Sequence, residues 1–93
     1  MSDRVHLIAE PTASPDTVKL VANRMLSEGA GESFASAAEA RGHPLAEAVF
    51  SVPGVARLYI LGDFMTITKS PQADWQRIGP VIQARLITLL NGR

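Results

Sequence analysis

The stretch at positions 55–69, VARLYILGDFMTITK, decides how the chain is expected to fold. Its first part, Val55–Leu61, is rich in the β-branched and aromatic residues that favour strands, and Phe64–Lys69 is a second segment of the same kind. Between them, Gly62-Asp63 is a two-residue turn signal, because glycine adopts a positive φ without a steric penalty. The stretch therefore predicts an antiparallel β-hairpin.

Two strand-like segments precede the hairpin. Residues 5–9 alternate weakly with period two, and residues 17–21 place Val18 and Leu20 on one face. Between them, PTASPD at positions 11–16 combines two prolines with small polar residues, a composition typical of a loop. A connection of this length allows the two segments to pair as antiparallel strands.

Residues 22–43 carry the weakest pattern in the chain. Gly29-Ala30-Gly31 interrupts them, and the following Glu32–Ala35 is compatible with a short strand or with a turn. Ser36 and Glu39 have the spacing of a capping box, which predicts a short helical turn that Gly42 ends. We expect no full element here, and both interpretations of residues 32–35 stay open.

Two helices are expected, one on each side of the hairpin. Pro44 suits the first position of a helix, where its missing N–H costs no hydrogen bond, and Pro53-Gly54 ends that helix. The last helix begins at Ser70 or Asp74 and ends at Asn91-Gly92. Its apolar residues recur at helical spacing: Trp75, Ile78, Ile82, Leu86, Leu89 and Leu90.

The expected element order is β-β-α-β-β-α, in one domain that spans residues 1–93. Pro80 interrupts the last helix, either by kinking it or by marking its effective first position. The order predicts an α+β fold of two layers. Both helices then pack on one face of a mostly antiparallel, four-stranded sheet.

The composition argues against several functions. Nine Lys and Arg residues balance nine Asp and Glu residues, so there is no net charge to attract a nucleic acid. The absence of cysteine excludes thiolate catalysis, disulfides and cysteine-ligated iron–sulfur or zinc sites within this chain. No run of ~18 apolar residues predicts a membrane span, and the first residues lack signal-peptide features. We expect a cytoplasmic protein with neither nucleic acid nor membrane as its partner.

Candidate catalytic and metal-binding residues are few, and each has a simpler explanation. His6 and His43 are the only imidazoles, and their spacing does not favour zinc over two surface histidines. Asp16 and Asp63 are accounted for as loop and turn residues. The chain has no G-x-S-x-G elbow, phosphate-binding loop or dinucleotide fingerprint. No catalytic residue, metal site or bound cofactor is therefore predicted, and the chain is not expected to be an enzyme.

Four ordered blocks of sequence resemble the N-terminal domain of the Nfu family, the NifU-like scaffold and carrier proteins of iron–sulfur clusters. Residues 10–19, EPTASPDTVK, resemble the E-P-T-P-N-P-N-T-L-K segment that opens this domain. Residues 40–55 resemble its A-x-x-x-P-L-A…L-F-x-I-P-G-V stretch. Residues 63–69, DFMTITK, are similar to its D-F-I-T-V-T-K strand, and Asp74-Trp75 to its D-W helix start. The resemblance runs from about residue 7 to residue 90.

The resemblance implies a role in the assembly or delivery of iron–sulfur clusters. Nfu proteins usually continue into a second domain whose C-x-x-C motif holds the cluster, and nothing in this chain matches that domain. The chain is then either a piece of a longer Nfu protein or a protein with this domain alone. Within the first block, Ala13 replaces a proline of the family pattern, while Ser14 and Asp16 replace asparagines. These exchanges suit a loop and leave the expected fold unchanged.

The leading hypothesis is therefore a non-catalytic module that binds iron–sulfur biogenesis proteins or their apo-targets and binds no cluster itself. The residues expected to contact a partner are Glu10, Pro11, Thr12, Asp16, Lys19 and Lys69. One alternative is a structural accessory that orients a neighbouring domain or self-associates. Another is a small ligand-binding protein, which requires Glu10, His6 and Asp63 to converge in one pocket. The sequence leaves the oligomeric state open.

Overall fold

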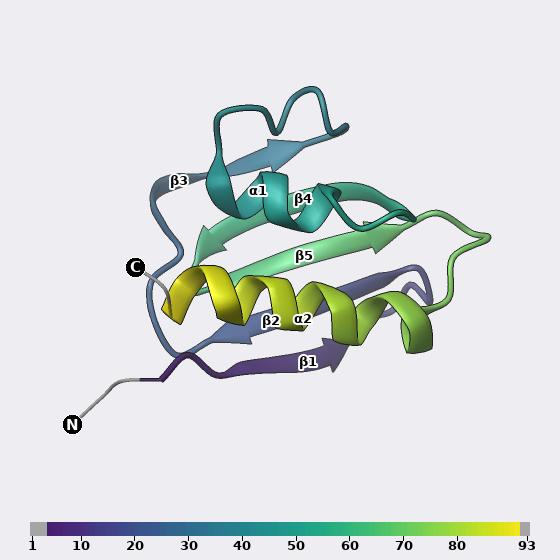
Figure 1. The fold of residues 1–93 in the computed structure, drawn as a ribbon, viewed down its shortest axis with the longest axis horizontal. Coiled ribbons are helices and arrows are strands. Elements are labelled where there is room, and N and C mark those ends of the chain that lie inside the picture. Colours follow the sequence, from purple (N-terminus) through teal and green to yellow (C-terminus); the bar gives the residue numbers. More distant parts are fainter. Residues whose placement is uncertain (1–3, 92–93) are drawn as a thin grey trace.

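Five strands and two helices make up the computed structural model, which describes residues 4–91, the side chain of Glu28 excepted. The strands form one antiparallel sheet in the order β1-β2-β5-β4-β3, and both helices cover the same face of it (Figure 1). This arrangement confirms the expected α+β class and the packing of the helices on one face. The elements are β1 (Leu7–Pro11), β2 (Thr17–Ala22), β3 (Ser27–Phe34), α1 (Pro44–Phe50), β4 (Val55–Gly62), β5 (Phe64–Lys69) and α2 (Trp75–Asn91).

The hairpin predicted over residues 55–69 is confirmed and supplies the centre of the sheet. Leu61 lies opposite Phe64 across the two-residue turn, and Ile60 lies opposite Met65. Gly62 has a φ of 60°, the left-handed conformation that the turn requires. In the finished sheet β5 is the central strand, so the hairpin gives both β2 and β3 a strand to pair with.

The sheet has a fifth strand, and the expected count of four strands in the order β-β-α-β-β-α is wrong. β3 pairs with β4 and makes the order β-β-β-α-β-β-α. The register of this pair shifts between Ser27 and Glu32, and both Gly29 and Gly31 have positive φ. At such an irregularity the residues that follow can change from one face of the sheet to the other. The alternation of apolar and polar residues by which a strand is recognised in a sequence is then lost.

The core lies between the sheet and the helices. Leu58, Ile60, Met65 and Ile67 point from the hairpin toward the helix layer and are at most 1% exposed. The buried residues of α2 follow one another about one turn apart and pack against these strand residues. They are Ile82, Leu86 and Leu90. The helical spacing in the sequence therefore identified the packed side of α2 correctly.

Both helices begin where the sequence places them, and the histidine cap of α1 is an addition that the sequence analysis did not predict. At the start of α1 the imidazole of His43 accepts a hydrogen bond from the Ala46 amide, and Pro44 occupies the first helical position. At α2 the Asp74 carboxylate accepts from the Gln76 amide. Pro80 lies inside α2, so the interpretation of Pro80 as the effective start is wrong. Gly92, part of the expected stop signal, lies outside the described residues.

Candidate interaction surface

The loop between β1 and β2, which holds Thr12 and Asp16 of the predicted contact residues, is fixed by hydrogen bonds from three sides. The hydroxyl of Thr12 donates to the Thr17 carbonyl oxygen at 2.9 Å, across the base of the loop. The indole Nε1 of Trp75, the first residue of α2, donates to the Pro15 carbonyl oxygen at 3.0 Å. The loop is therefore held to the sheet and to the helix layer at once.

Lys69 forms the third anchor of this loop. Its Nζ lies 2.8 Å from an Asp16 carboxylate oxygen, and its backbone N–H donates to the Asp16 carbonyl oxygen at 2.8 Å. The lysine is only 9% exposed, because residues 65, 67 and 69 share the core-facing side of β5. A buried ammonium is stable only when it is paired and hydrogen-bonded, so this ion pair is a structural contact.

We predict that Asp16→Asn destabilises the fold through the charge it leaves on Lys69. The expected loss is about 1–2 kcal/mol, at the low end for a buried pair, because the Asp16 side chain is itself 36% exposed. Lys69→Met removes that charge, so the double variant should lose less stability than the two single variants added together. Urea unfolding of the four proteins measures this coupling, and strictly additive losses would contradict it.

The face of the sheet opposite the helices carries a continuous apolar row. The strand register places Ile8 of β1 opposite Val21 of β2, Val21 opposite Phe64 of β5, and Phe64 opposite Leu61 of β4. Residues directly opposite one another share a face, so these four side chains form one row across four strands. Val21, Phe64 and Leu61 are half-buried, and Ile8 is 61% exposed. We call this the apolar row.

A mixed polar row lies next to the apolar row on the same face. Glu10, Lys19, Thr66 and Tyr59 are opposite one another in turn. The Lys19 ammonium lies 4.6 Å from the centre of the Phe64 ring, a distance at which a cation is attracted to the aromatic face. Charge and aromatic surface therefore meet at one place, which is typical of residues that take part in protein–protein interfaces.

The structure separates the six predicted contact residues into three pairs. Glu10 and Lys19 lie side by side on the open face of the sheet. Pro11 and Thr12 are exposed at the start of the loop. Asp16 and Lys69 bind each other, which gives them a role inside the fold. Sequence reasoning missed the apolar row, although its signal was present: in β4 and β5 both alternating faces carry apolar residues.

The remaining candidate groups do not come together as a catalytic or metal site. Glu32 contacts the Nε2 of His43 at 3.1 Å, while the other ring nitrogen of His43 caps α1. Among the described side chains, which exclude that of Glu28, no cluster of three or more metal-ligating groups occurs. Glu10 and Asp63 are separated along the sheet, since Asp63 follows β4 beside Ala22 and Glu10 pairs with Lys19. Nor does any helix within residues 4–91 have the length and apolarity to cross a membrane.

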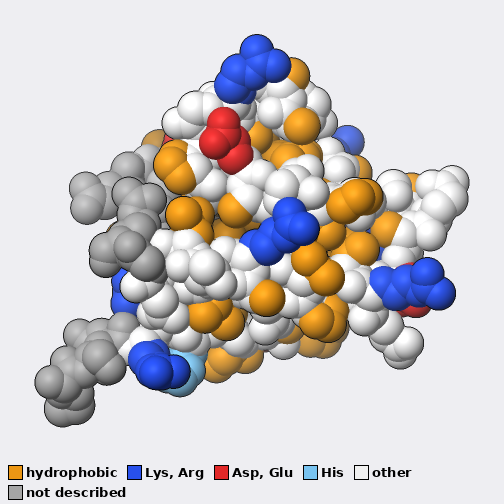
Figure 2. Space-filling model, viewed as in Figure 1, with side chains coloured by type: hydrophobic (Ala, Val, Ile, Leu, Met, Phe, Trp, Pro, Cys, Tyr) orange, Lys and Arg blue, Asp and Glu red, His pale blue; other side chains and the backbone are white. Residues whose placement is uncertain are grey.

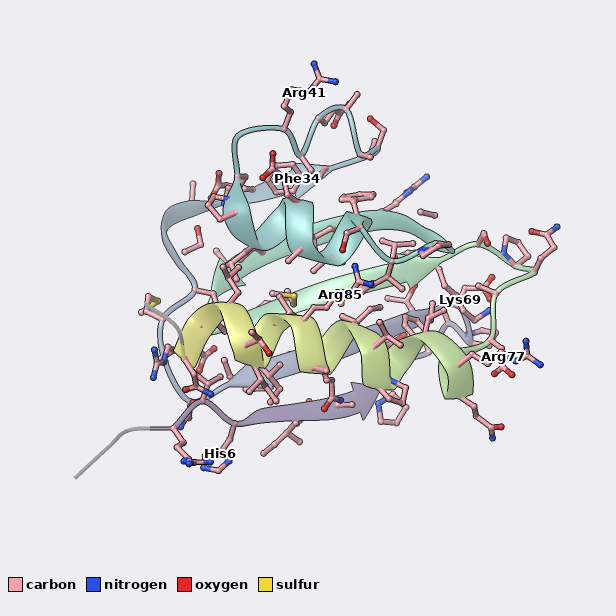
Figure 3. The ribbon with its side chains drawn as sticks, viewed as in Figure 1. His6, Phe34, Arg41, Lys69, Arg77 and Arg85 are labelled. Carbon is pink, nitrogen blue, oxygen red and sulfur yellow. The ribbon has the colours of Figure 1, made fainter. Side chains whose placement is uncertain are left out.

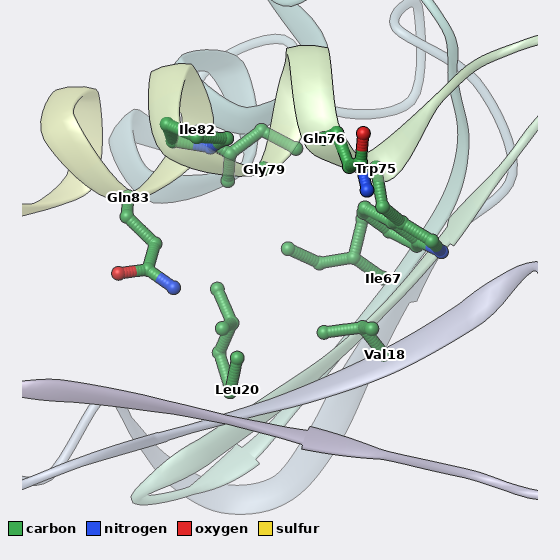
Figure 4. A pocket seen from close by; sticks show the side chains of 10 residues that line it. Val18, Leu20, Ile67, Trp75, Gln76, Gly79, Ile82 and Gln83 are labelled. Atoms are coloured by element: carbon green, nitrogen blue, oxygen red, sulfur yellow. The ribbon is translucent and has the colours of Figure 1, made fainter.

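The helix-bearing face has an apolar groove of about 400 Å³ between α2 and the strands β1 and β2. Figure 2 shows apolar side chains spread over this face between separated basic ones. In Figure 4, Val18, Leu20 and Ile67 point from the sheet toward α2, and Gln83 reaches from the helix over the groove. The lining contains no charged side chain and none of His6, Glu10 or Asp63. The ligand-binding alternative therefore gains no support from this groove.

Comparison with proteins of known sequence gives a family match and several relatives. Residues 7–92 match the family described as scaffold protein Nfu/NifU N terminal, a description that names no catalytic activity. The chain is 34% identical over 76 residues to the mitochondrial NFU1 iron–sulfur cluster scaffold homolog of Drosophila ananassae, covering 81% of the chain and 27% of that protein. It is 30% identical over 78 residues to the mitochondrial NifU-like protein 4 of Arabidopsis thaliana, covering 84% of the chain and 28% of that protein. The chain thus spans about a quarter of the length of these relatives.

Solved structures share the fold. A NifU-like protein from Saccharomyces cerevisiae superposes with a TM-score of 0.84 at 24% identity, covering 97% of this chain and 82% of that one. The protein SAV1430 from Staphylococcus aureus superposes with a TM-score of 0.74 at 16% identity, covering 89% and 98%. Sequence match and fold agree over nearly the whole chain, which therefore belongs to the Nfu/NifU N-terminal family of scaffold proteins.

Proposed function

We propose that this chain is a non-catalytic interaction module that serves the assembly or delivery of iron–sulfur clusters. It binds partner proteins of that process, or their apo-targets, and holds no cluster itself. One observation carries the proposal: a chain of the scaffold family has no cysteine with which to ligate iron. Cytoplasmic location stays a prediction, since the mitochondrial location of several relatives is stated for those proteins alone.

The open face of the sheet supports a binding role. Antiparallel sheets that expose one face to water usually place polar side chains there. Here the apolar row crosses four strands, with Lys19 over Phe64 beside it. An apolar centre with a polar border is the composition of a protein–protein interface, and the fixed backbone of the sheet presents it without a cost in ordering.

Anaerobic reconstitution with iron, sulfide and a thiol reductant tests whether the chain holds a cluster. We expect the desalted protein to be colourless and to retain neither metal nor sulfide. A NifU-like domain with a C-x-x-C motif, treated in parallel, is the positive control for the chemistry. A brown protein with a stable iron–sulfur absorption band would contradict the proposal, because it would show ligation by non-cysteine groups of this chain.

A further inference from the structure

β1 leaves one edge of the sheet open. It pairs only with β2, and Figure 1 shows α2 lying over β2, with β1 beyond it. The His6 amide donates to the side chain of Asn23, the residue that directly follows β2. The N–H group of His6 therefore points toward the β2 side of β1. Backbone groups alternate direction along a strand. Leu7 and Ala9 therefore turn their N–H and C=O groups outward, away from β2.

Residues 7–9 of this edge carry no charged side chain, proline or bulge, the features that usually prevent strand pairing. Proteins protect free edges with lysine, proline or bulges. Residues 7–10 contain none of these side chains, and their pairing with β2 is regular. Pro11 comes only at the last position, where it limits the free segment. Ile8, in the middle of the segment, is 61% exposed.

We infer that the occupant of this edge is a second copy of the chain, paired antiparallel through β1 about a twofold axis at Ile8. In that register Ile8 lies opposite the partner's Ile8, and Leu7 lies opposite the partner's Ala9. The outward N–H and C=O groups of Leu7 and Ala9 then bond to their counterparts. The two sheets join into one of ten strands.

The match between a hydrogen-bond donor and a carboxylate favours the second copy and this register. With Ile8 on the axis, His6 lies opposite the partner's Glu10, and by symmetry Glu10 lies opposite the partner's His6. Among the side chains that the structure describes, neither has an ion-pair partner. Figure 3 shows His6 at the free edge, pointing away from α2. The twofold axis thus pairs an imidazole with a carboxylate at both ends of the joined strands.

The groove beside β1 is open where this register places the leucine at position 7 of the second copy. The partner's Leu7 lies opposite Ala9, on the helix-facing side, where Ala9, Gly79 and Pro80 line the groove. A Cβ added at Gly79 would meet no atom within 4 Å, so the space beneath α2 is open. Leu7, which packs at the edge of its own core, then also covers the rim of the partner's groove and buries apolar area that β-strand pairing alone does not supply.

Sedimentation velocity over a concentration series tests this dimer. A single strand pair buries less than the ~1,600 Å² of a standard interface, so the series must extend to about 1 mM. Wild-type protein should shift from monomer toward dimer. Ile8→Lys and Ala9→Pro should each lower the association constant about tenfold or more. Proline at position 9 removes only an outward N–H, so the pairing with β2 is kept.

Two further measurements decide between this surface and another. Ser33→Lys, an exposed change on the opposite edge strand β3, should leave the association constant unchanged. Glu10→Lys should weaken the dimer by removing the carboxylate that accepts from His6, and His6→Glu by placing two carboxylates opposite each other. The two changes combined should restore the dimer, because Glu at position 6 then lies opposite Lys at position 10 of the partner. Monomeric wild type at every concentration, or a dimer unaffected by these variants, would overturn the proposal. Thermal unfolding of each variant separates loss of pairing from loss of the fold.

Discussion

Replacement of Ile60 by alanine is expected to lower the free energy of unfolding by about 3 kcal/mol, within the 2–5 kcal/mol range for isoleucine removed from a packed core. Ile60 is fully buried in β4, opposite the equally buried Met65 of the central strand. A domain of this length has a total stability of roughly 5–14 kcal/mol, so the change removes a large share of it. Chemical denaturation with a constant m-value measures the loss.

Leu61 provides the matched control, because it is the next residue on the same strand and points to the opposite face. It is half-buried and lies outside the core cluster. Leu61→Ala should therefore cost about 1 kcal/mol, the value for removing partly exposed apolar area. Equal losses at the two positions would contradict the assignment of the two faces of β4.

The parts of the fold that the sequence predicted are those set by local chemistry. The hairpin follows from a glycine turn between two β-forming segments, and both helix starts follow from Pro44 and Asp74. β3 was not predictable in the same way. Gly29 and Gly31 have positive φ at the point where the register of β3 against β4 shifts. The side chain of Tyr59 in β4 lies against Gly31. Only the neighbouring strand shows that this segment belongs to the sheet.

The candidate surface was harder to predict, because its residues come together only when the sheet forms. The contact of Lys69 with Asp16 joins residues 53 positions apart, so no local pattern reveals the ion pair that accompanies the burial of this lysine. The apolar row likewise combines one residue from each of four strands. A sequence shows that a strand has two apolar faces, but which strands lie side by side is a property of the topology.

Phe64→Thr is expected to reduce the capture of iron–sulfur biogenesis proteins by about tenfold or more, which corresponds to losing an aromatic anchor from the centre of an interface. Phe64 is the link between Val21 and Leu61 in the apolar row, and Lys19 lies over its ring. Threonine keeps a high preference for β-strands, so the fold is retained. The measurement is quantitative mass spectrometry of proteins retained by the tagged chain from an extract of its source cells.

Val81→Thr is the control for this capture experiment, because it removes exposed apolar surface from α2, on the other face of the molecule. Val81 is 40% exposed, so the change is comparable in kind but lies away from the apolar row. If the open face binds the partner, only the Phe64 variant loses capture. Equal retention by both variants would place the contact elsewhere. A scaffold-family module that binds no cluster can serve cluster assembly only by binding partners. If the unmodified chain retains no iron–sulfur biogenesis protein at all, the proposed function is therefore wrong, and a purely structural role is favoured.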